Sequence, residues 1–435
     1  MLINWKPYKL IELYDISSGL SKSAEEFGFG FPFLSFSTVF KNYFIPEELD
    51  QLVNSSIKEQ TSCSIKKGDV FLTRTSEVIE ELGMSCVALK DYPNATFNGF
   101  TKRLRPKNEE EVDPLFIGYY LRNIQFRAEI SAYSTLTTRA SLNNGIIEKL
   151  KITIPSLPVQ NKIASILSSY DELIKNNKQR IKLLEEMAEE IYKEWFVRLR
   201  FPGYENTKNL DGLPLGWERK PIDEFLSFSM SKAKLKKFNS TKTYIATADV
   251  TDINITGQGE IIDWENKPSR AQLVPELNSV FFARMSNTYK VLVFSKTNKE
   301  LIDELALTSG FLGLKALNEE TLPYLFWLIK SETFHNYKDV FANGATQVSL
   351  TNEGFHNIKL VEPSLSVIEK FGKSTSAFLS EIITLNKKNQ LLQETRDLLL
   401  PRLISGKLSV EHLIDEELKM VAEPRAEYKK AKQQE

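Results

Sequence analysis

The sequence predicts a mixed α/β protein, in which two similar globular domains are separated by an antiparallel two-helix coiled coil. Three observations lead to this prediction. The segment "PSLPVQ" at Pro155 returns as "PSLSVI" at Pro363, 208 residues later. Each copy is followed by a long stretch with a helical seam, and strand-like runs fill the region before it. We therefore expect a tandem repeat with pseudo-twofold symmetry, because 435 residues exceed one ordinary core.

The repeat extends well beyond the two short segments. The same offset places Ser141-Leu142 on Ser349-Leu350 and Leu183-Leu184 on Leu391-Leu392, and further upstream "GDVFLTRTS" faces "NSVFFARMS". A period this long is not a solenoid unit, so the chain is a duplicated half-protein. The predicted divisions are a first domain at 1–155, a helix at 156–200, a second domain at 201–363, a helix at 364–412 and a C-terminal tail at 413–435.

The two domains are expected to contain both strands and helices. Runs such as "KGDVFLTR", "SCVAL", "LNSVFFAR" and "KVLVFS" have the apolar, β-branched and aromatic composition of short buried strands. The helical stretches behind the domains alternate steps of four and three residues, which is a heptad seam. The first seam is Ile163, Leu167, Tyr170, Ile174, Asn177, Ile181, Leu184, Ala188, Ile191 and Trp195; the second is Phe371, Phe378, Ile382, Leu385, Asn389, Leu392, Leu399 and Leu403, with Thr375 and Arg396 as further polar positions.

An alternative is that each seam belongs to an ordinary amphipathic helix on its own domain. Two copies of about 40 residues favour pairing instead, because ~60 Å of helix is too long for one domain to cover. The second domain begins after the first helix and leads into the second helix, so we expect the helices to run antiparallel. Paired residue numbers then sum to 566, and Asn177 lies opposite Asn389, where a buried Asn pair can fix the register.

The sequence contains no recognisable catalytic motif. Net charge is −1, from 56 basic and 57 acidic side chains, so no global basic field is present. There is no phosphate-binding loop, no metal-binding pattern, and only three histidines. We therefore expect no catalytic and no metal-binding residues. No stretch is long and apolar enough for a membrane span, and two cysteines suit a reducing compartment, so a cytoplasmic location is expected.

The helical regions resemble a known family. The run "LPVQNKIASILSSYDELIKNNKQRIKLLEEMAEEIYKEWFVRLRFPG", followed by "LPLGW" and "LLQETRDLLLPRLISGKL", is similar to type I restriction-modification DNA specificity subunits. The resemblance implies two target-recognition domains, each reading one part of a split double-stranded DNA target, and helices that space them and dock two methyltransferase subunits. It also implies restriction and motor subunits as partners, in the cytoplasm of a bacterial or archaeal cell. S-adenosylmethionine, ATP and Mg²⁺ are expected on those partners, and no cofactor on this chain.

Candidate DNA-contacting residues come from three kinds of segment. Polar side chains follow equivalent strands at Arg74, Thr75, Ser76 and at Arg284, Ser286, Asn287; polar loops precede each copied segment at Thr137, Thr138, Arg139 and at Thr346, Gln347. The densest basic run holds Lys232, Lys234, Lys236 and Lys237, with a weaker version at Lys102 and Arg103. Surface ion pairs, solvated side chains and simple turn chemistry are the alternative explanations.

For partner docking, the best candidates are the exposed helix flanks and the aromatic end "IYKEWFVRLRF". Trp195 lies on the seam, so core packing is its expected role, whereas Phe196 lies one step away from it and is the better candidate for docking. The leading hypothesis is a DNA specificity subunit without intrinsic catalysis. Two alternatives remain open: a non-catalytic DNA-binding regulator with two readers, and a stand-alone DNA-modifying enzyme with unfamiliar motifs.

Overall fold

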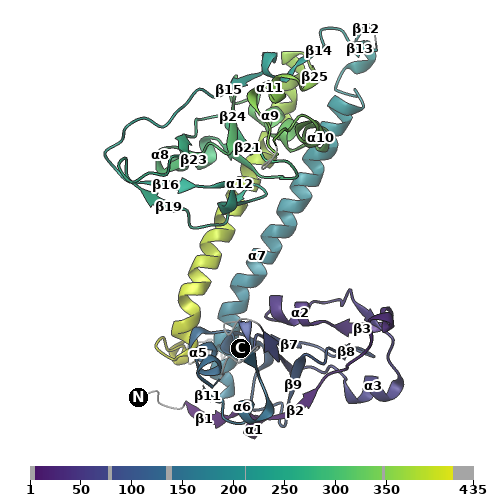
Figure 1. Ribbon diagram of the computed structural model, residues 1–435, viewed down its shortest axis with the longest axis vertical. Coiled ribbons are helices and arrows are strands. Elements are labelled where there is room, and N and C mark those ends of the chain that lie inside the picture. Colours follow the sequence, from purple (N-terminus) through teal and green to yellow (C-terminus); the bar gives the residue numbers. More distant parts are fainter. Residues whose placement is uncertain (1–4, 77–80, 134–139, 211, 345–347, 415–435) are drawn as a thin grey trace, which may run out of the picture. The chain divides into compact units, whose positions relative to one another are not determined.

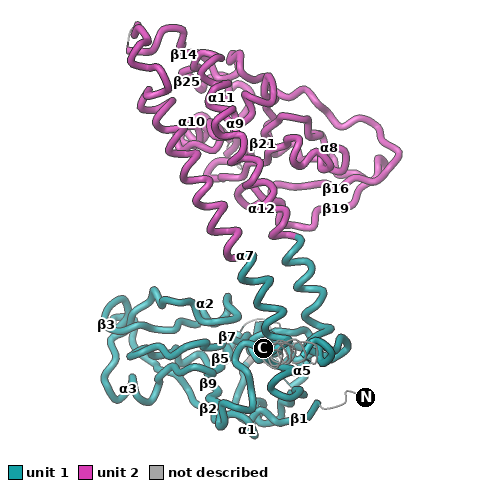
Figure 2. The backbone as a smooth tube through the Cα atoms, turned by 180° about the vertical axis from the view of Figure 1, so that it is seen from behind, with its two compact units in different colours: residues 1–174, 391–435 teal, residues 175–390 magenta. Residues whose placement is uncertain are grey.

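The computed structural model describes residues 5–76, 81–133, 140–210, 212–344 and 348–414 (Figure 1). The chain forms two compact units, one of residues 1–174 with 391–435 and one of residues 175–390 (Figure 2). Each unit therefore contains most of one predicted domain together with a part of both long helices. None of the helices in these described ranges has an apolar stretch that could cross a bilayer.

The first unit is built on a four-stranded antiparallel sheet. Its strands lie in the order β2 (Tyr14–Ser18), β9 (Thr101–Pro106), β5 (Val70–Thr73) and β7 (Ser85–Val87). Beside it are a sheet of β4 (Leu52–Val53), β3 (Phe27–Leu34) and β8 (Thr96–Phe97), and the pairs β1 (Lys6–Lys9) with β11 (Lys151–Ile154) and β6 (Thr75–Ser76) with β10 (Ala140–Ser141). The shorter helices are α1 (Leu10–Leu13), α2 (Phe36–Lys41), α3 (Ile57–Ser62), α4 (Pro114–Tyr120), α5 (Ile124–Tyr133) and α6 (Asn144–Ile147).

The second unit has the same central sheet. Its order is β15 (Phe228–Met230), β24 (Phe311–Ala316), β21 (Ser279–Ala283) and β22 (Val291–Phe294), again antiparallel throughout. A second sheet holds β19 (Glu260–Ile262), β16 (Lys242–Ile245), β23 (Leu305–Thr308) and β20 (Ala271–Leu273); the two-stranded pairs are β14 (Glu218–Pro221) with β25 (Lys359–Glu362), β12 (Asn209–Leu210) with β13 (Leu213–Pro214), and β17 (Val250–Thr251) with β18 (Asn254–Ile255). The shorter helices are α8 (Glu300–Glu304), α9 (Leu322–Lys330), α10 (Glu332–Val340) and α11 (Asn352–His356).

The tandem repeat is confirmed by this common topology. Helices α4, α5 and α6 of the first unit return as α9, α10 and α11 of the second, and the strand pair β1–β11 returns as β14–β25. The same capping chemistry starts the last helix of each set, because the Asn143 and Thr351 side chains accept hydrogen bonds from backbone N–H groups of the first turn.

Strands β5 and β21 explain why the copied "VFLT" and "VFFA" runs are apolar throughout. Every residue of both strands is buried. Alternate side chains point to opposite faces of a strand, so Val70 and Phe71 enter two different hydrophobic clusters, as do Val280 and Phe281. Each unit is therefore layered, with apolar groups on both faces of its central sheet.

The long helices α7 (Leu157–Tyr192) and α12 (Leu365–Ile404) lie side by side within each unit. A π-helical turn, Lys193–Val197, follows α7. In the first unit, Asp171 of α7 forms an ion pair with Arg396 of α12. In the second unit, Asn177 contacts Asn389, and the ring of Trp195 lies 5.7 Å from that of Phe371. Rising numbers on one helix meet falling numbers on the other, so the helices are antiparallel in the predicted register.

All the seam positions named above are buried or half-buried. Helix α12 also approaches the neighbouring domain closely at Gly372, where an added Cβ atom would lie 1.7 Å from the Glu320 carbonyl oxygen. A side chain there would collide with main-chain atoms, so this position requires glycine. The corresponding residue of α7 is Ala164, which is buried as well.

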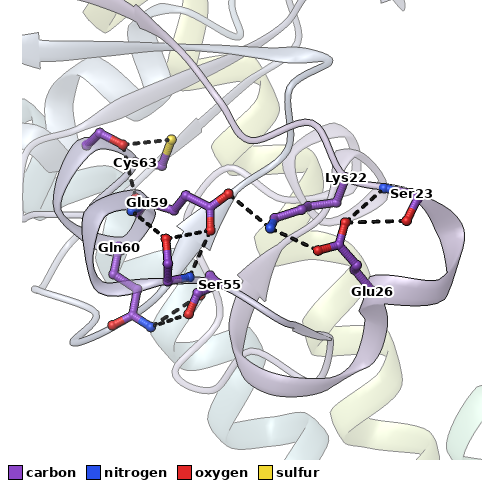
Figure 3. A network of polar contacts seen from close by, with 9 residues as sticks. Lys22, Ser23, Glu26, Ser55, Glu59, Gln60 and Cys63 are labelled. Carbon is purple, nitrogen blue, oxygen red and sulfur yellow. Dashed lines mark hydrogen bonds and ion pairs between the residues drawn. The ribbon is translucent and has the colours of Figure 1, made fainter.

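A polar network ties the start of β3 to helix α3 in the first unit (Figure 3). The Lys22 ammonium bridges the Glu26 and Glu59 carboxylates at 3.0 Å each. Glu59 also accepts a hydrogen bond from the Ser56 backbone N–H, and this bond and Lys22 lower the pKa of Glu59 to about 2. The network fixes the 22–26 turn that leads into β3.

Candidate nucleic-acid interface

In each unit the structure brings together two segments that the sequence marked separately. The Leu142 backbone N–H donates to the Arg74 carbonyl oxygen at 2.7 Å in the first unit. Leu350 donates in the same way to Arg284 at 2.8 Å in the second unit. The end of the central strand and the polar loop before the copied segment therefore lie side by side, at the same place in both units. We refer to these two places as the strand-end sites.

The first strand-end site is partly described. Thr75 and Ser76 form the short strand β6, which pairs with β10, and the Ser76 hydroxyl donates to Glu81 Oε2 at 3.0 Å. Arg74 is half-buried, and within the described ranges its Nε atom has no hydrogen-bond partner. The predicted contacts Thr137, Thr138 and Arg139 lie outside the described residues, as do Thr346 and Gln347 of the second site.

The Arg284 side chain forms hydrogen bonds that hold the second strand-end site together. Its Nε atom donates to the Phe311 carbonyl oxygen at 3.1 Å, and its two terminal nitrogens donate to the Leu350 carbonyl oxygen and to Asn352 Oδ1, both at 2.9 Å. Burial lowers the pKa of this guanidinium. The side chain is therefore engaged in joining three backbone segments, which is a positioning role that the sequence did not indicate.

A charge pair from α10, the buried Lys338 and the half-buried Asp339, holds the loop that follows Arg284. The fully buried Lys338 ammonium donates to the carbonyl oxygens of Met285 and Thr288 at 2.8 and 3.1 Å. The neighbouring Asp339 accepts from the Asn287 backbone N–H and the Ser286 hydroxyl at 3.0 and 3.2 Å. Sequence reasoning missed this pair, because a Lys-Asp dipeptide on a helix ordinarily indicates a solvated face.

Asn287 in this loop has an unusual backbone conformation. Its φ angle is 55°, in the left-handed region that Asn tolerates better than most residues. The contacts from Lys338 and Asp339 therefore fix the backbone that carries Asn287 and Tyr289. Both residues are exposed.

The basic run of the second unit forms an exposed ridge. Lys232, Lys234, Lys236 and Lys237 are all exposed, and no ion pair joins any of them to another described residue. Between them, Leu235 and Phe238 pack against a buried cluster, and the Leu235 backbone N–H bonds to the Gln272 carbonyl oxygen. We call these four residues the lysine ridge.

The first-unit candidates Lys102 and Arg103 are placed differently. Both are buried in β9, where Lys102 donates to the Ser18 hydroxyl at 2.9 Å and Arg103 donates to the Ser64 carbonyl oxygen at 2.6 Å. Burial lowers the pKa of each side chain. Their charged groups are engaged inside the domain, which places them poorly for the phosphate contact predicted from the sequence.

Phe196 is also placed differently from the prediction. Its ring lies 4.9 Å from that of Tyr324 and 5.0 Å from that of Phe371, in an aromatic cluster that also contains Trp195. Phe196 therefore packs against α9 and α12, as Trp195 does, and only part of its ring is exposed.

Within the described ranges, no group of three His, Cys, Asp or Glu side chains is placed to hold a metal ion.

Comparisons with known proteins agree with this architecture. Residues 3–186 match the family model for the type I restriction modification DNA specificity domain. The type I restriction enzyme MjaIX specificity subunit of Methanocaldococcus jannaschii is 24% identical over 94% of this chain and 95% of its own length. The HindI specificity subunit of Haemophilus influenzae is 22% identical over 93% of this chain and 100% of its own length.

The fold has a solved relative. The crystal structure of the type I restriction-modification S subunit from M. genitalium superimposes with a TM-score of 0.57 at 16% identity, covering 92% of this chain and 96% of that one. Over residues 3–186 and nearly the full length of its relatives, the chain is therefore similar to type I restriction-modification DNA specificity subunits, and it shares its fold with a solved member of that group.

Proposed function

We propose that the chain recognises a bipartite double-stranded DNA site, with one half-site for each target-recognition domain, on behalf of a type I restriction-modification complex. The observation that carries this proposal is the pair of strand-end sites. The same main-chain scaffold holds polar side chains at the same place in both units, while the side chains themselves differ. A shared scaffold with different contact groups is what two independent half-sites require.

The available side chains divide by the chemistry of their contacts. Ser286, Asn287, Thr75 and Ser76 can donate and accept hydrogen bonds, as contact with base edges requires. No ion pair joins the lysine ridge to the part of the chain that the structure describes, and such exposed charges suit contact with phosphate groups. We therefore assign base recognition to the strand-end sites and backbone contact in the second unit to the lysine ridge.

The helices supply two equivalent surfaces for partner subunits. Leu183 of α7 and Leu391 of α12 are repeat equivalents, and they are 58% and 54% exposed. Other exposed apolar side chains of these helices are Leu173, Met187 and Leu398. Exposed leucines at the same position of both copies are consistent with docking of two methyltransferase subunits, one at each copy. S-adenosylmethionine, ATP and Mg²⁺ belong, in this proposal, to the methyltransferase and restriction subunits.

The test uses the chain with and without its methyltransferase partner. Transfer of a labelled methyl group to DNA is expected only when both are present, and the double variant Leu183→Glu, Leu391→Glu is expected to lose co-purification of the methyltransferase. Lys178→Glu, on the exposed face of α7, is the control for an added acidic side chain. Methyl transfer by the chain alone would contradict the proposal.

A further inference from the structure

The two long helices carry a polar contact in the first unit that has no polar counterpart in the second. Asp171 of α7 accepts a hydrogen bond from the Tyr119 hydroxyl at 2.5 Å and forms an ion pair with Arg396 of α12. The Arg396 side chain is only 17% exposed. This arrangement explains why an arginine occupies a seam position.

The repeat equivalents of these three residues are apolar. Tyr119 corresponds to Trp327, Asp171 to Leu379 and Arg396 to Ala188, at the offset of 208 residues. All three equivalents are buried in the core of the second unit. The same helix crossing is therefore closed by an ion pair in one unit and by hydrophobic packing in the other.

A second polar contact lies in the seam of the second unit. The Asn177 side chain donates to Asn389 Oδ1 at 2.9 Å, and both residues are buried. In the same register Ile181 lies opposite Leu385, and both belong to one hydrophobic cluster. At these two levels of the seam, an amide faces an amide and an apolar side chain faces an apolar side chain.

Pairing of either helix with a second copy of itself would break both matches. In the equivalent register, α7 against α7 places Asn177 opposite Ile181, and α12 against α12 places Asn389 opposite Leu385. Asp171 would meet Ala188 in the first case. The two Asn pairings each leave a buried amide without its partner, and the Asp171 pairing leaves the carboxylate without Arg396. The twofold symmetry of a self-pair repeats every mismatch.

Arg396 would also lose its partner in a pair of two α12 helices. The same register places it beside Leu379, so its guanidinium would lose the Asp171 carboxylate. A third contact also favours pairing of α7 with α12. Lys330 of α9 forms an ion pair with Glu185 of α7 at 2.5 Å. The equivalent of Glu185 on α12 is the uncharged Gln393, which cannot form this ion pair.

We propose that these polar residues make the helix pair selective for unlike partners: α7 accepts α12 and rejects a second α7, and α12 rejects a second α12. The selectivity keeps two different recognition domains together and excludes symmetric assemblies of two identical halves. This inference rests on the helix contacts alone and is independent of the proposed DNA target.

The first test uses the full chain cut once after it has folded. A protease site inserted between the exposed residues Lys208 and Asn209 gives two pieces of different mass. The pieces are allowed to re-pair by unfolding in urea and dilution, and native mass spectrometry counts the pairs. We expect self-pairs to make up less than roughly a tenth of the total. Random pairing, with about half of the total as self-pairs, would overturn the inference.

A second variant removes the four polar residues that we propose select the partner helix. In the cut chain with Asp171→Leu, Arg396→Ala, Asn177→Leu and Asn389→Leu, self-pairs are expected to increase at least several-fold. Lys182→Gln, which removes an exposed ion pair with Glu186 within α7, is the control and is expected to change nothing. A variant with the same pair distribution as the wild type would show that other residues select the partner.

The second test needs no re-pairing and uses the uncut chain. Asp171→Leu and Arg396→Ala are each expected to lower the urea midpoint of unfolding, because each removes the ion pair between the helices and leaves its other charged member at the helix contact. The double variant, which has the apolar composition of the second unit, is expected to recover most of that loss. A strictly additive double variant would overturn the inference, because the two residues would then not depend on each other.

Discussion

Replacement of the lysine ridge should change how DNA binding depends on salt. The perturbation is the variant with Lys232, Lys234, Lys236 and Lys237 all changed to Gln. These lysines are exposed, and they have no ion-pair partner among the described residues, so their charge is available to a ligand. Along an extended chain, alternate residues lie about 6.6 Å apart, so several phosphates of one DNA strand are within reach.

The size of the effect follows from counterion release. Each phosphate neutralised contributes about −0.9 to the slope of log Kobs against log salt concentration. Loss of all four contacts reduces the magnitude of the slope by about 3.6, and loss of two reduces it by about 1.8. We expect a reduction between these values. Discrimination between target and non-target DNA should change far less, because phosphate contacts carry no direct sequence information.

The assay is fluorescence anisotropy of labelled target DNA with the chain assembled on its methyltransferase, at four or five salt concentrations. The matched control changes four other exposed lysines of the second unit, Lys208, Lys299, Lys359 and Lys370, to Gln, which alters net charge by the same amount. If both variants change the slope equally, or if neither changes it, the assignment of the ridge to phosphate contact is refuted.

Three further predictions concern the second unit. Lys338→Met should lower the free energy of unfolding by about 3 kcal/mol in urea titrations and weaken recognition of one half-site only, because it leaves Asp339 and two loop carbonyl groups without their partner. Burial and the Lys338 charge lower the pKa of His335 from 6.5 to about 4, so the unfolded chain binds the proton more readily and stability should fall as pH decreases from 6.5 toward 4; His335→Phe should flatten this part of the pH profile. Asn389→Leu should cost about 1 to 3 kcal/mol by isolating the Asn177 amide, whereas the double change to Leu should restore most of it in thermal unfolding.

The long-range features of the fold were predictable because they repeat. Duplication made the equivalence of the two sheets visible, and the heptad spacing was enough to place Asn177 opposite Asn389. An antiparallel seam leaves few choices of register once the two polar positions are known. The strands β5 and β21 were also predictable, since central strands buried on both faces have continuous apolar runs.

The site was predicted less well, because charge and burial are decided by tertiary contacts. Lys102 and Arg103 have the composition of a basic patch, yet their strand is central to a sheet and buries them. Phe196 lies beside the seam in sequence, but the π-helical turn Lys193–Val197 places it in the aromatic cluster with Tyr324. Lys338 was overlooked for the opposite reason, because a buried lysine is recognisable only from the carbonyl groups around it.

The central claim is that one chain recognises two separate half-sites. The most direct measurement is a genome-wide map of DNA methylation in cells carrying this chain with its methyltransferase, compared with cells that lack the chain. We predict one bipartite motif that disappears with the chain, and replacement of the first target-recognition domain by that of a relative should alter one half of the motif only. A single continuous motif, or a change in both halves after that replacement, would contradict the account.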